Sequence, residues 1–200
     1  IQGVYELGST FKIFTIAQAL ELDLVDPKTK INTKGPIRIG GHKINDYRNN
    51  GPELPVWQVI TESSNLGTAR IAKLIGPEKQ REFLSNLGFT NPTSIEMIEA
   101  SGGKPLLPKR WNELETMTIS YGHGLSATPL HLATGYAVLA NGGRLVKPTL
   151  IEGDKFELGP QIISKEVAEN SLAMLRGVVT EGTASLADVN GYLVAGKTGT

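Results

Sequence analysis

The amino-acid sequence predicts an α+β fold in which helices dominate and the β-sheet is incomplete. Apolar residues recur at helical spacing in several segments, above all in the run that follows Ser9. Start and stop signals enclose further helices, such as Thr128-Pro129 before one apolar stretch and Asn141-Gly142-Gly143 after it. Only one confident strand is indicated near the residues that could carry chemistry, over residues 191–199.

The first half of the chain is predicted to hold a buried helix, a hairpin and three short helices. The first helix is ended by Asp26-Pro27 and shows the i, i+3, i+4, i+7 pattern of a packed helix at Ile13, Ile16, Ala17, Leu20 and Leu24. Gly40-Gly41 within the alternating residues 31–45 predicts the hairpin. The short helices are expected at 55–61, at about 65–75, and from Pro77 to a stop at Gly88.

The second half begins with a loop over residues 89–108, which are rich in Pro, Gly, Thr and Ser. Helices are expected over 111–120, 129–140 and 164–180. The helix over 129–140 is almost wholly apolar, so we expect it to belong to the core. Tyr192 and Val194 alternate with their neighbours, which predicts the strand from Gly191 to Gly199.

Composition excludes several classes of function. The net charge is zero, so nothing suggests a nucleic-acid partner or an electrostatic grip on a membrane. The absence of cysteine rules out disulfides, zinc–thiolate sites and thiol catalysis, and we expect no metal and no cofactor. No signal peptide and no apolar stretch of about 20 residues is present. Because the chain begins at Ile1 and stops at Thr200 inside a motif, we expect residues 1–200 to be a single internal fragment, truncated at both ends.

Ser9 and Lys12 form the first candidate catalytic pair. Residues three apart on a helix have Cβ atoms roughly 5–6 Å apart, so an amine would stand beside a hydroxyl. A neutral amine can take the proton of a serine nucleophile, and burial or a nearby cation lowers a lysine pKa enough for this. Taken alone, the pair fits an N-cap serine followed by a solvated first-turn lysine better than it fits a catalytic pair.

Two further motifs follow in order. Ser63 could relay a proton, and Asn65 offers a donor and an acceptor to a substrate amide, although Ser-Ser-Asn is also common in turns that cap helices. Residues 197–200, Lys-Thr-Gly-Thr, would present a cation and two hydroxyls to a carboxylate, or form an ordinary strand end. Together the three motifs make up the serine acyl-enzyme signature of penicillin-binding proteins and β-lactamases.

Over nearly all of its 200 residues the chain resembles the transpeptidase domain of class B penicillin-binding proteins, and most of all the septal, cell-division members. The resemblance includes Tyr5 to Lys12, Val56 to Ile60, Ser120 to Ala133, Leu139 to Gly143, Glu181 to Ala184 and Val194 to Thr200. Leu7, where the family usually has proline, and the stretch from Glu96 to Gly102 depart from the pattern without touching the motifs.

The resemblance implies a β-lactamase/transpeptidase-like fold, of which this fragment supplies the helical subdomain and one strand of the antiparallel sheet. It implies that Ser9 is acylated by the penultimate D-Ala of a peptidoglycan stem peptide, with Lys12 as base, Ser63 as proton relay and Asn65 orienting the amide or the lysine. The substrate or β-lactam carboxylate would be held by Lys197, Thr198 and Thr200, with Gly199 giving the substrate backbone room. The oxyanion hole would be the N–H groups of Ser9 and Thr200.

The same resemblance implies a parent protein anchored in the bacterial inner membrane, with its catalytic domain in the periplasm or outside the membrane. Its partners would be a glycosyltransferase and other division proteins, and the isolated fragment is expected to be inactive. Three other readings stay open: a serine β-lactamase or D,D-carboxypeptidase, a β-lactam-sensing receptor domain, and a non-enzymatic structural role for the fragment. Glu62 could activate a deacylating water in a hydrolase, but a surface position is expected. His123 is expected to be structural or to line the substrate site, and His42 and His131 to have no catalytic role.

Overall fold

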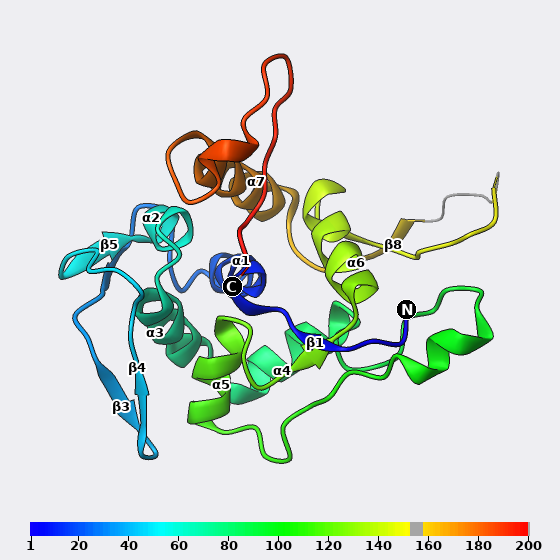
Figure 1. Ribbon diagram of the computed structural model, residues 1–200, viewed down its shortest axis with the longest axis horizontal. Coiled ribbons are helices and arrows are strands. Elements are labelled where there is room, and N and C mark those ends of the chain that lie inside the picture. The colour runs from blue at the N-terminus through cyan, green and yellow to red at the C-terminus, as the bar shows by residue number, and fades with distance from the viewer. Residues whose placement is uncertain (153–157, 200) are drawn as a thin grey trace.

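A computed structural model describes residues 1–152 and 158–199 (Figure 1). The α-helices in this part of the chain are α1 (Lys12–Glu21), α2 (Val56–Thr61), α3 (Asn65–Ile75), α4 (Pro77–Asn86), α5 (Glu113–Ser120), α6 (Pro129–Ala140) and α7 (Lys165–Thr180). Three short 3₁₀ helices accompany them: η1 (Gly8–Phe11), η2 (Ile98–Gly102) and η3 (Ser185–Ala187). The described residues contain no helix of sufficient length and apolar character to cross a membrane.

The strands form four separate two-stranded antiparallel pairs in the described residues. They are β1 (Tyr5–Glu6) with β6 (Ser126–Ala127), β2 (Lys30–Asn32) with β5 (Glu53–Pro55), β3 (Ile37–Ile39) with β4 (His42–Ile44), and β7 (Arg144–Val146) with β8 (Leu158–Gln161). The hairpin expected at Gly40-Gly41 is confirmed as β3–β4. The α+β class, mostly helical with small antiparallel pairs, is therefore as predicted.

Helix α1 is the centre of the fold and packs against α3 and α7 (Figure 1). Every residue from Lys12 to Leu20 is buried, because apolar side chains cover nearly the whole circumference of the helix. The helix ends at Glu21, earlier than the sequence predicts, and Asp23 takes a positive φ of 52° just beyond the end. That left-handed residue turns the chain before Asp26-Pro27 is reached.

An aromatic cluster packs beside α1. The rings of Phe11, Phe14 and Phe89 meet pairwise with centroids 5.0 to 5.2 Å apart, and Tyr136 of α6 joins Phe14 edge-on at 5.6 Å. All three phenylalanines are at most 2% exposed. The cluster ties η1 and α1 to the loop after α4, and so fixes the start of α1 where Ser9 and Lys12 lie.

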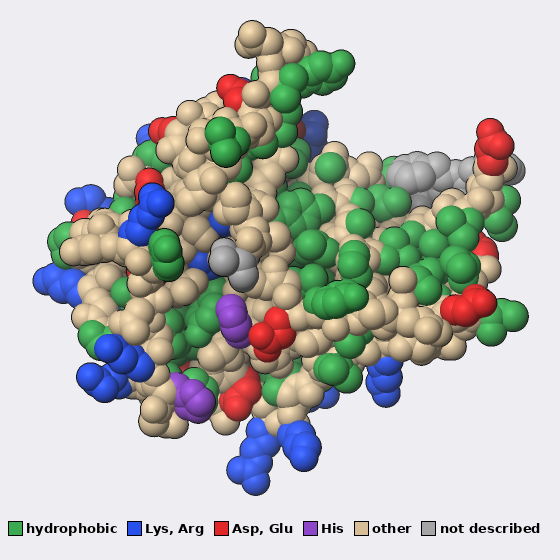
Figure 2. Space-filling model, in the orientation of Figure 1, with side chains coloured by type: hydrophobic (Ala, Val, Ile, Leu, Met, Phe, Trp, Pro, Cys, Tyr) green, Lys and Arg blue, Asp and Glu red, His purple; other side chains and the backbone are tan. Residues whose placement is uncertain are grey.

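Helix α6 contributes to the core as predicted, but only along one face. His131, Gly135, Val138 and Leu139 are buried, while the other faces of α6 are partly or fully exposed. Figure 2 shows apolar side chains gathered over this region of the surface. An apolar composition cannot tell a fully enclosed helix from one with an open apolar face, because both lack polar positions.

The strand predicted over residues 191–199 is wrong, since these residues are irregular in the structure. Their backbone bonds to α7 instead: Gly196 N–H donates to Leu175 O at 3.2 Å, and Val194 O accepts from the Arg176 guanidinium at 2.8 Å. A strand needs a neighbouring strand for its ladder, and in the described residues no other strand lies alongside. In Figure 1 the chain after α7 runs outward as a loop, and residues 191–199 return from it toward α1.

Candidate active site

Ser9 lies in the 3₁₀ turn η1, which continues directly into α1 at Lys12. In a 3₁₀ turn, residues i and i+3 lie above one another, so the two side chains share one face. The turn is held from behind by the loop that follows α5, because Gly8 N–H donates to Gly122 O at 3.1 Å. A Cβ on Gly122 would lie 2.0 Å from Gly8 O, so only glycine permits this approach. The Glu6 carboxylate adds a second clamp by accepting from Gly124 N–H at 2.7 Å.

Lys12 is completely buried at the first position of α1. Its Nζ donates to Ser63 O at 2.5 Å and to Ser63 Oγ at 3.0 Å. Burial, followed by the nearby charge of Lys197, lowers the pKa of Lys12 from 10.5 to about 7, and the Asp46 carboxylate partly opposes this. The interpretation of Lys12 as a solvated helix residue is therefore wrong. A large fraction of the Lys12 side chain is the neutral amine near pH 7.

Ser63 lies in the tight turn between α2 and α3, with a positive φ of 57° that non-glycine residues rarely adopt. The turn is fixed by Ser64, which caps α3 by accepting from Gly67 N–H at 2.9 Å. Ser64 Oγ also donates to the Asp46 carboxylate at 2.7 Å, and the same carboxylate accepts from Leu66 N–H at 2.8 Å. These bonds hold the strained residue in place, and its hydroxyl faces Lys12.

Lys197 completes a three-residue constellation. Its Nζ donates to Ser63 Oγ at 2.9 Å, so one hydroxyl accepts from two lysines that are 185 positions apart in the chain. Burial lowers the pKa of Lys197 from 10.5 to about 8. Lys197 Nζ also lies 3.3 Å from both the carbonyl and the hydroxyl oxygen of Thr198.

The third motif also reaches the first. A Cβ on Gly199 would lie 3.2 Å from the methyl group of Thr10, so Gly199 lies against the turn that carries Ser9. Asn65 is the first residue of α3, and its side chain donates to Asn45 O at 3.0 Å. Thr200, expected to bind the carboxylate and to form the oxyanion hole, lies outside the described residues.

Three contributors to this site were missed by sequence reasoning. Asp46 holds the Ser63 turn, Gly122 supports the Ser9 turn, and Thr183 contacts Thr198 through their hydroxyls at 2.9 Å. None belongs to a motif whose chemistry is evident from spacing alone. A signal existed for the last two, because both lie in stretches on which the family resemblance was based.

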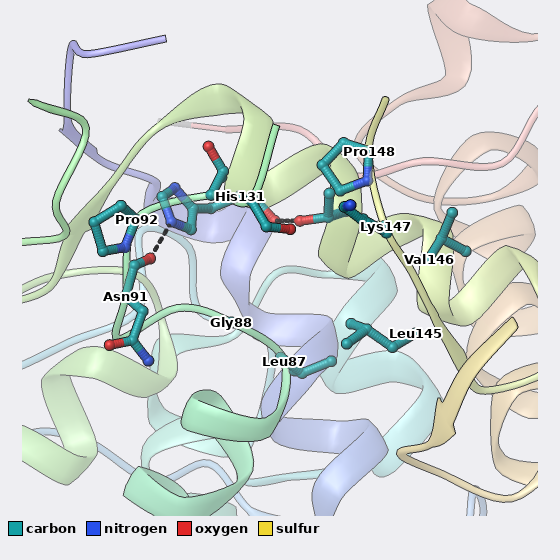
Figure 3. Close-up of a pocket in the computed structure, with 12 residues that line it drawn as sticks. Leu87, Gly88, Asn91, Pro92, His131, Leu145, Val146, Lys147 and Pro148 are labelled. Atoms are coloured by element: carbon teal, nitrogen blue, oxygen red, sulfur yellow. Dashed lines mark hydrogen bonds between the residues drawn. The ribbon is translucent and has the colours of Figure 1, made fainter. Parts of the chain in front are cut away.

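The described residues outside this constellation offer no metal site. Among residues 1–152 and 158–199, no group of three His, Asp or Glu residues is placed to hold a metal ion. A cavity of about 140 Å³ between α6 and the loops after α4 and β7 contains no motif residue (Figure 3). There His131 Nε2 lies 2.8 Å from Asn91 O, and its Nδ1 lies 2.7 Å from the Thr128 hydroxyl, as in a helix-capping residue.

The chain is similar to known proteins over its whole length. Residues 1–200 match the model of the family "Penicillin binding protein transpeptidase domain". The chain is 34% identical to a probable peptidoglycan D,D-transpeptidase FtsI of Caulobacter vibrioides and 30% identical to the peptidoglycan D,D-transpeptidase FtsI of Escherichia coli K12. These alignments cover 99% and 100% of the chain but 34% of each relative, so the chain spans about a third of their length.

A solved structure shows the same fold. The transpeptidase domain of Burkholderia pseudomallei penicillin-binding protein 3 superposes with a TM-score of 0.91 at 34% sequence identity. The superposition covers 99% of this chain and 61% of that one.

Proposed function

Since the chain belongs to the penicillin-binding protein transpeptidase domain family, we propose that it provides the catalytic residues of a peptidoglycan D,D-transpeptidase that β-lactams inhibit. The observation that carries the proposal is the pair of lysines, Lys12 buried and Lys197 partly buried, that share the hydroxyl of Ser63 and have lowered, unequal pKa values. One can be neutral and act as a base while the other keeps its charge for a carboxylate.

In the acylation step, Ser9 Oγ attacks the carbonyl carbon of the penultimate D-Ala. Its proton passes to Lys12, a C–O bond forms, and the C–N bond to the terminal D-Ala breaks. A neutral amine has two N–H groups and one lone pair. The two donors of Lys12 are directed at the oxygens of Ser63, which leaves the lone pair for the proton of Ser9.

Ser63 then returns the proton to the leaving group. Its Oγ is in contact with Lys12, so protonated Lys12 can give a proton to this hydroxyl while the hydroxyl gives its own to the departing amine. The strained φ of Ser63 supports such a role, because strain of this kind persists where the surrounding structure holds a residue in one orientation.

Substrate binding is assigned to Asn65 and the third motif. Asn65 orients the substrate amide, and the carboxylate of D-Ala or of a β-lactam pairs with Lys197 and with the hydroxyls of Thr198 and Thr200. Gly199 leaves space for the substrate backbone, and the N–H groups of Ser9 and Thr200 stabilise the oxyanion. The contact between Lys197 and Thr198 supports a shared carboxylate site.

The acyl-enzyme is resolved by an amine from a second stem peptide, which attacks the ester carbonyl and releases Ser9. The position of Glu62 favours transpeptidation over hydrolysis. It is exposed at the end of α2 and has no contact with Lys12 or Ser63 among the described interactions, so it is poorly placed to activate water.

We place the whole protein in the bacterial inner membrane, with this domain in the periplasm or outside the membrane. It would cross-link the wall at the division septum together with a glycosyltransferase and other division proteins. The relatives named as peptidoglycan D,D-transpeptidases support the cross-linking activity, and the resemblance to septal, cell-division members supports the location.

Mass spectrometry of the full-length protein after treatment with penicillin tests the proposal. We expect one adduct, on the peptide that contains Ser9, and no adduct in Ser9→Ala. Ser101→Ala is the matched control, because it removes an exposed hydroxyl that bonds Ile98 O outside the motifs, and its adduct should remain on Ser9. An adduct on Ser63, or one that survives Ser9→Ala, would overturn the assignment. In a second experiment the protein is acylated with a stem-peptide substrate instead of penicillin. Addition of an amine acceptor should then release the acyl group from Ser9 as a cross-linked product rather than as a free acid.

A further inference from the structure

The segment after α7, Glu181 to Ala184, has no role in the chemistry described above. Its threonine nevertheless reaches the candidate site, because Thr183 Oγ1 lies 2.9 Å from Thr198 Oγ1. Thr198 in turn lies next to Lys197, whose ammonium is 3.3 Å from the same hydroxyl oxygen. An unbroken chain of polar contacts therefore runs from Lys12 through Ser63, Lys197 and Thr198 to Thr183, where it ends.

Thr183 is held in place by backbone contacts with α2. Its N–H donates to Thr61 O at 3.3 Å, two residues before Ser63. Gly182 makes this approach possible, since a Cβ there would lie 2.7 Å from the same carbonyl oxygen. Ala184 N–H closes the turn by donating to Val178 O at 3.0 Å. The backbone of Thr183 thus has a fixed position relative to the Ser63 turn, and its hydroxyl links this turn to the third motif.

We propose that Thr183 is a positioning residue that directs the hydroxyl of Thr198 toward the substrate carboxylate; this inference rests on the proposed function of Thr198. A hydroxyl has one hydrogen to donate and two lone pairs to accept. The oxygen of Thr198 accepts from Lys197 with one lone pair. When Thr183 donates to the other, the only favourable use left for the Thr198 hydrogen is an acceptor supplied by the ligand.

The direction of the hydrogen bond between Thr183 and Thr198 decides whether Thr198 can donate to a carboxylate. If Thr198 donated to Thr183 instead, it would offer no hydrogen to a carboxylate. An arriving carboxylate accepts more strongly than a neutral hydroxyl, so it selects the arrangement in which Thr183 donates. Thr183 makes that arrangement available without moving any backbone atom, and it thereby favours ligands that carry a carboxylate at this position.

Thr183 is exposed, so substitutions there should perturb the fold little. The test uses the full-length protein with Thr183→Val, which removes the hydroxyl at similar size, and Thr183→Ser, which keeps it. Acylation by a fluorescent penicillin is measured over a range of concentrations, so that the apparent Kd is separated from the acylation rate constant. We expect Thr183→Val to raise the apparent Kd about three- to tenfold, as loss of one hydrogen bond does, with a smaller change in the rate constant. Thr183→Ser should keep the apparent Kd close to the wild-type value.

A double-mutant cycle shows whether Thr183 acts through Thr198. In a Thr198→Val background, Thr183→Val should have no further effect, because the hydroxyl that it positions is gone. A penicillin methyl ester, which lacks the carboxylate, should bind with the same affinity to wild type and Thr183→Val. Additive losses in the cycle, or an equal loss with the ester, would overturn the inference, as would a Thr183→Val protein that binds penicillin like wild type.

The failure of this inference differs visibly from failure of the proposed function. If wild type forms no adduct on Ser9, the function is wrong. If wild type is acylated and Thr198→Val is impaired while Thr183→Val is not, only the role of Thr183 is wrong. A melting temperature for each variant shows whether the fold is intact, and Thr183→Ala replaces Thr183→Val if the latter melts early.

Discussion

The charge of Lys197 should control the pH at which Lys12 becomes an effective base. In the wild type, the acylation rate should rise as pH passes through about 7, where Lys12 loses its proton, and fall through about 8, where Lys197 loses the charge that pairs with a carboxylate. Replacing Lys197 by glutamine removes a positive charge that lowers the pKa of Lys12. The acid limb of the profile must then move to higher pH.

The size of this shift follows from the geometry. Both nitrogens lie within 3.0 Å of Ser63 Oγ, so they are at most about 6 Å apart. Two unit charges at that distance repel by about 0.7 kcal/mol in water and about 3 kcal/mol at an effective dielectric constant of about 20. At 1.36 kcal/mol per pKa unit, the acid limb should rise by about 0.5 to 2 units.

The assay is the second-order rate of acylation of the full-length protein by a fluorescent penicillin, measured between about pH 5 and pH 10. Asp46→Asn serves as the control of opposite sign, because its carboxylate raises the pKa of Lys12. Asparagine keeps polar groups beside Ser64 and Leu66 while removing the charge. Its acid limb should move to lower pH. The coupling between the two lysines would be refuted if the acid limbs of the two variants moved in the same direction. It would also be refuted if the acid limb of Lys197→Gln did not move.

Four further predictions concern the base, the support of Ser9, the core and residues 1–200 on their own. Lys12→Arg should abolish acylation, because guanidinium stays charged; trapping of labelled penicillin checks this, and near-normal trapping would rule out Lys12 as the base. Gly122→Ala should slow acylation at least tenfold, since its Cβ would lie 2.0 Å from Gly8 O; a normal rate would show that the turn tolerates displacement. Phe89→Ala should lower the free energy of unfolding by about 3–5 kcal/mol in a denaturant titration, and less than about 1 kcal/mol would contradict its place in the aromatic cluster. Finally, residues 1–200 alone should not bind penicillin at the rate of the full-length protein, because no strand among residues 1–152 and 158–190 lies beside residues 191–199.

Much of the fold follows from the sequence, because its signals are local. Thr128-Pro129 begins α6 as predicted, with the Thr128 hydroxyl accepting from His131 N–H, and Ser164 caps α7 in the same way. The buried character of α1 follows from its nearly continuous apolar residues. Such features depend on backbone geometry within one or two turns, which short-range patterns describe well. The family was likewise evident, because its three motifs occur in order along a chain that resembles it throughout.

Residues 191–199 show where local reasoning fails. Tyr192 and Val194 alternate as strand residues do, but a strand forms only when another strand completes its ladder, and the sequence of one segment says nothing about its neighbours. The exposed face of α6 has the same origin, since composition describes the helix and not what covers it.

The sequence by itself determined the candidate reacting groups: Ser9 and Lys12 one turn apart, the Ser63 turn and the Lys197 motif. Only the tertiary structure decided their chemistry, because a lysine pKa depends on burial and on charges that the fold brings near. Lys12 has a pKa of about 7 because α1 is buried and Lys197 lies close by, 185 positions along the chain. Asp46 and Thr183 join the site for the same reason, through contacts between segments that no spacing along the sequence relates.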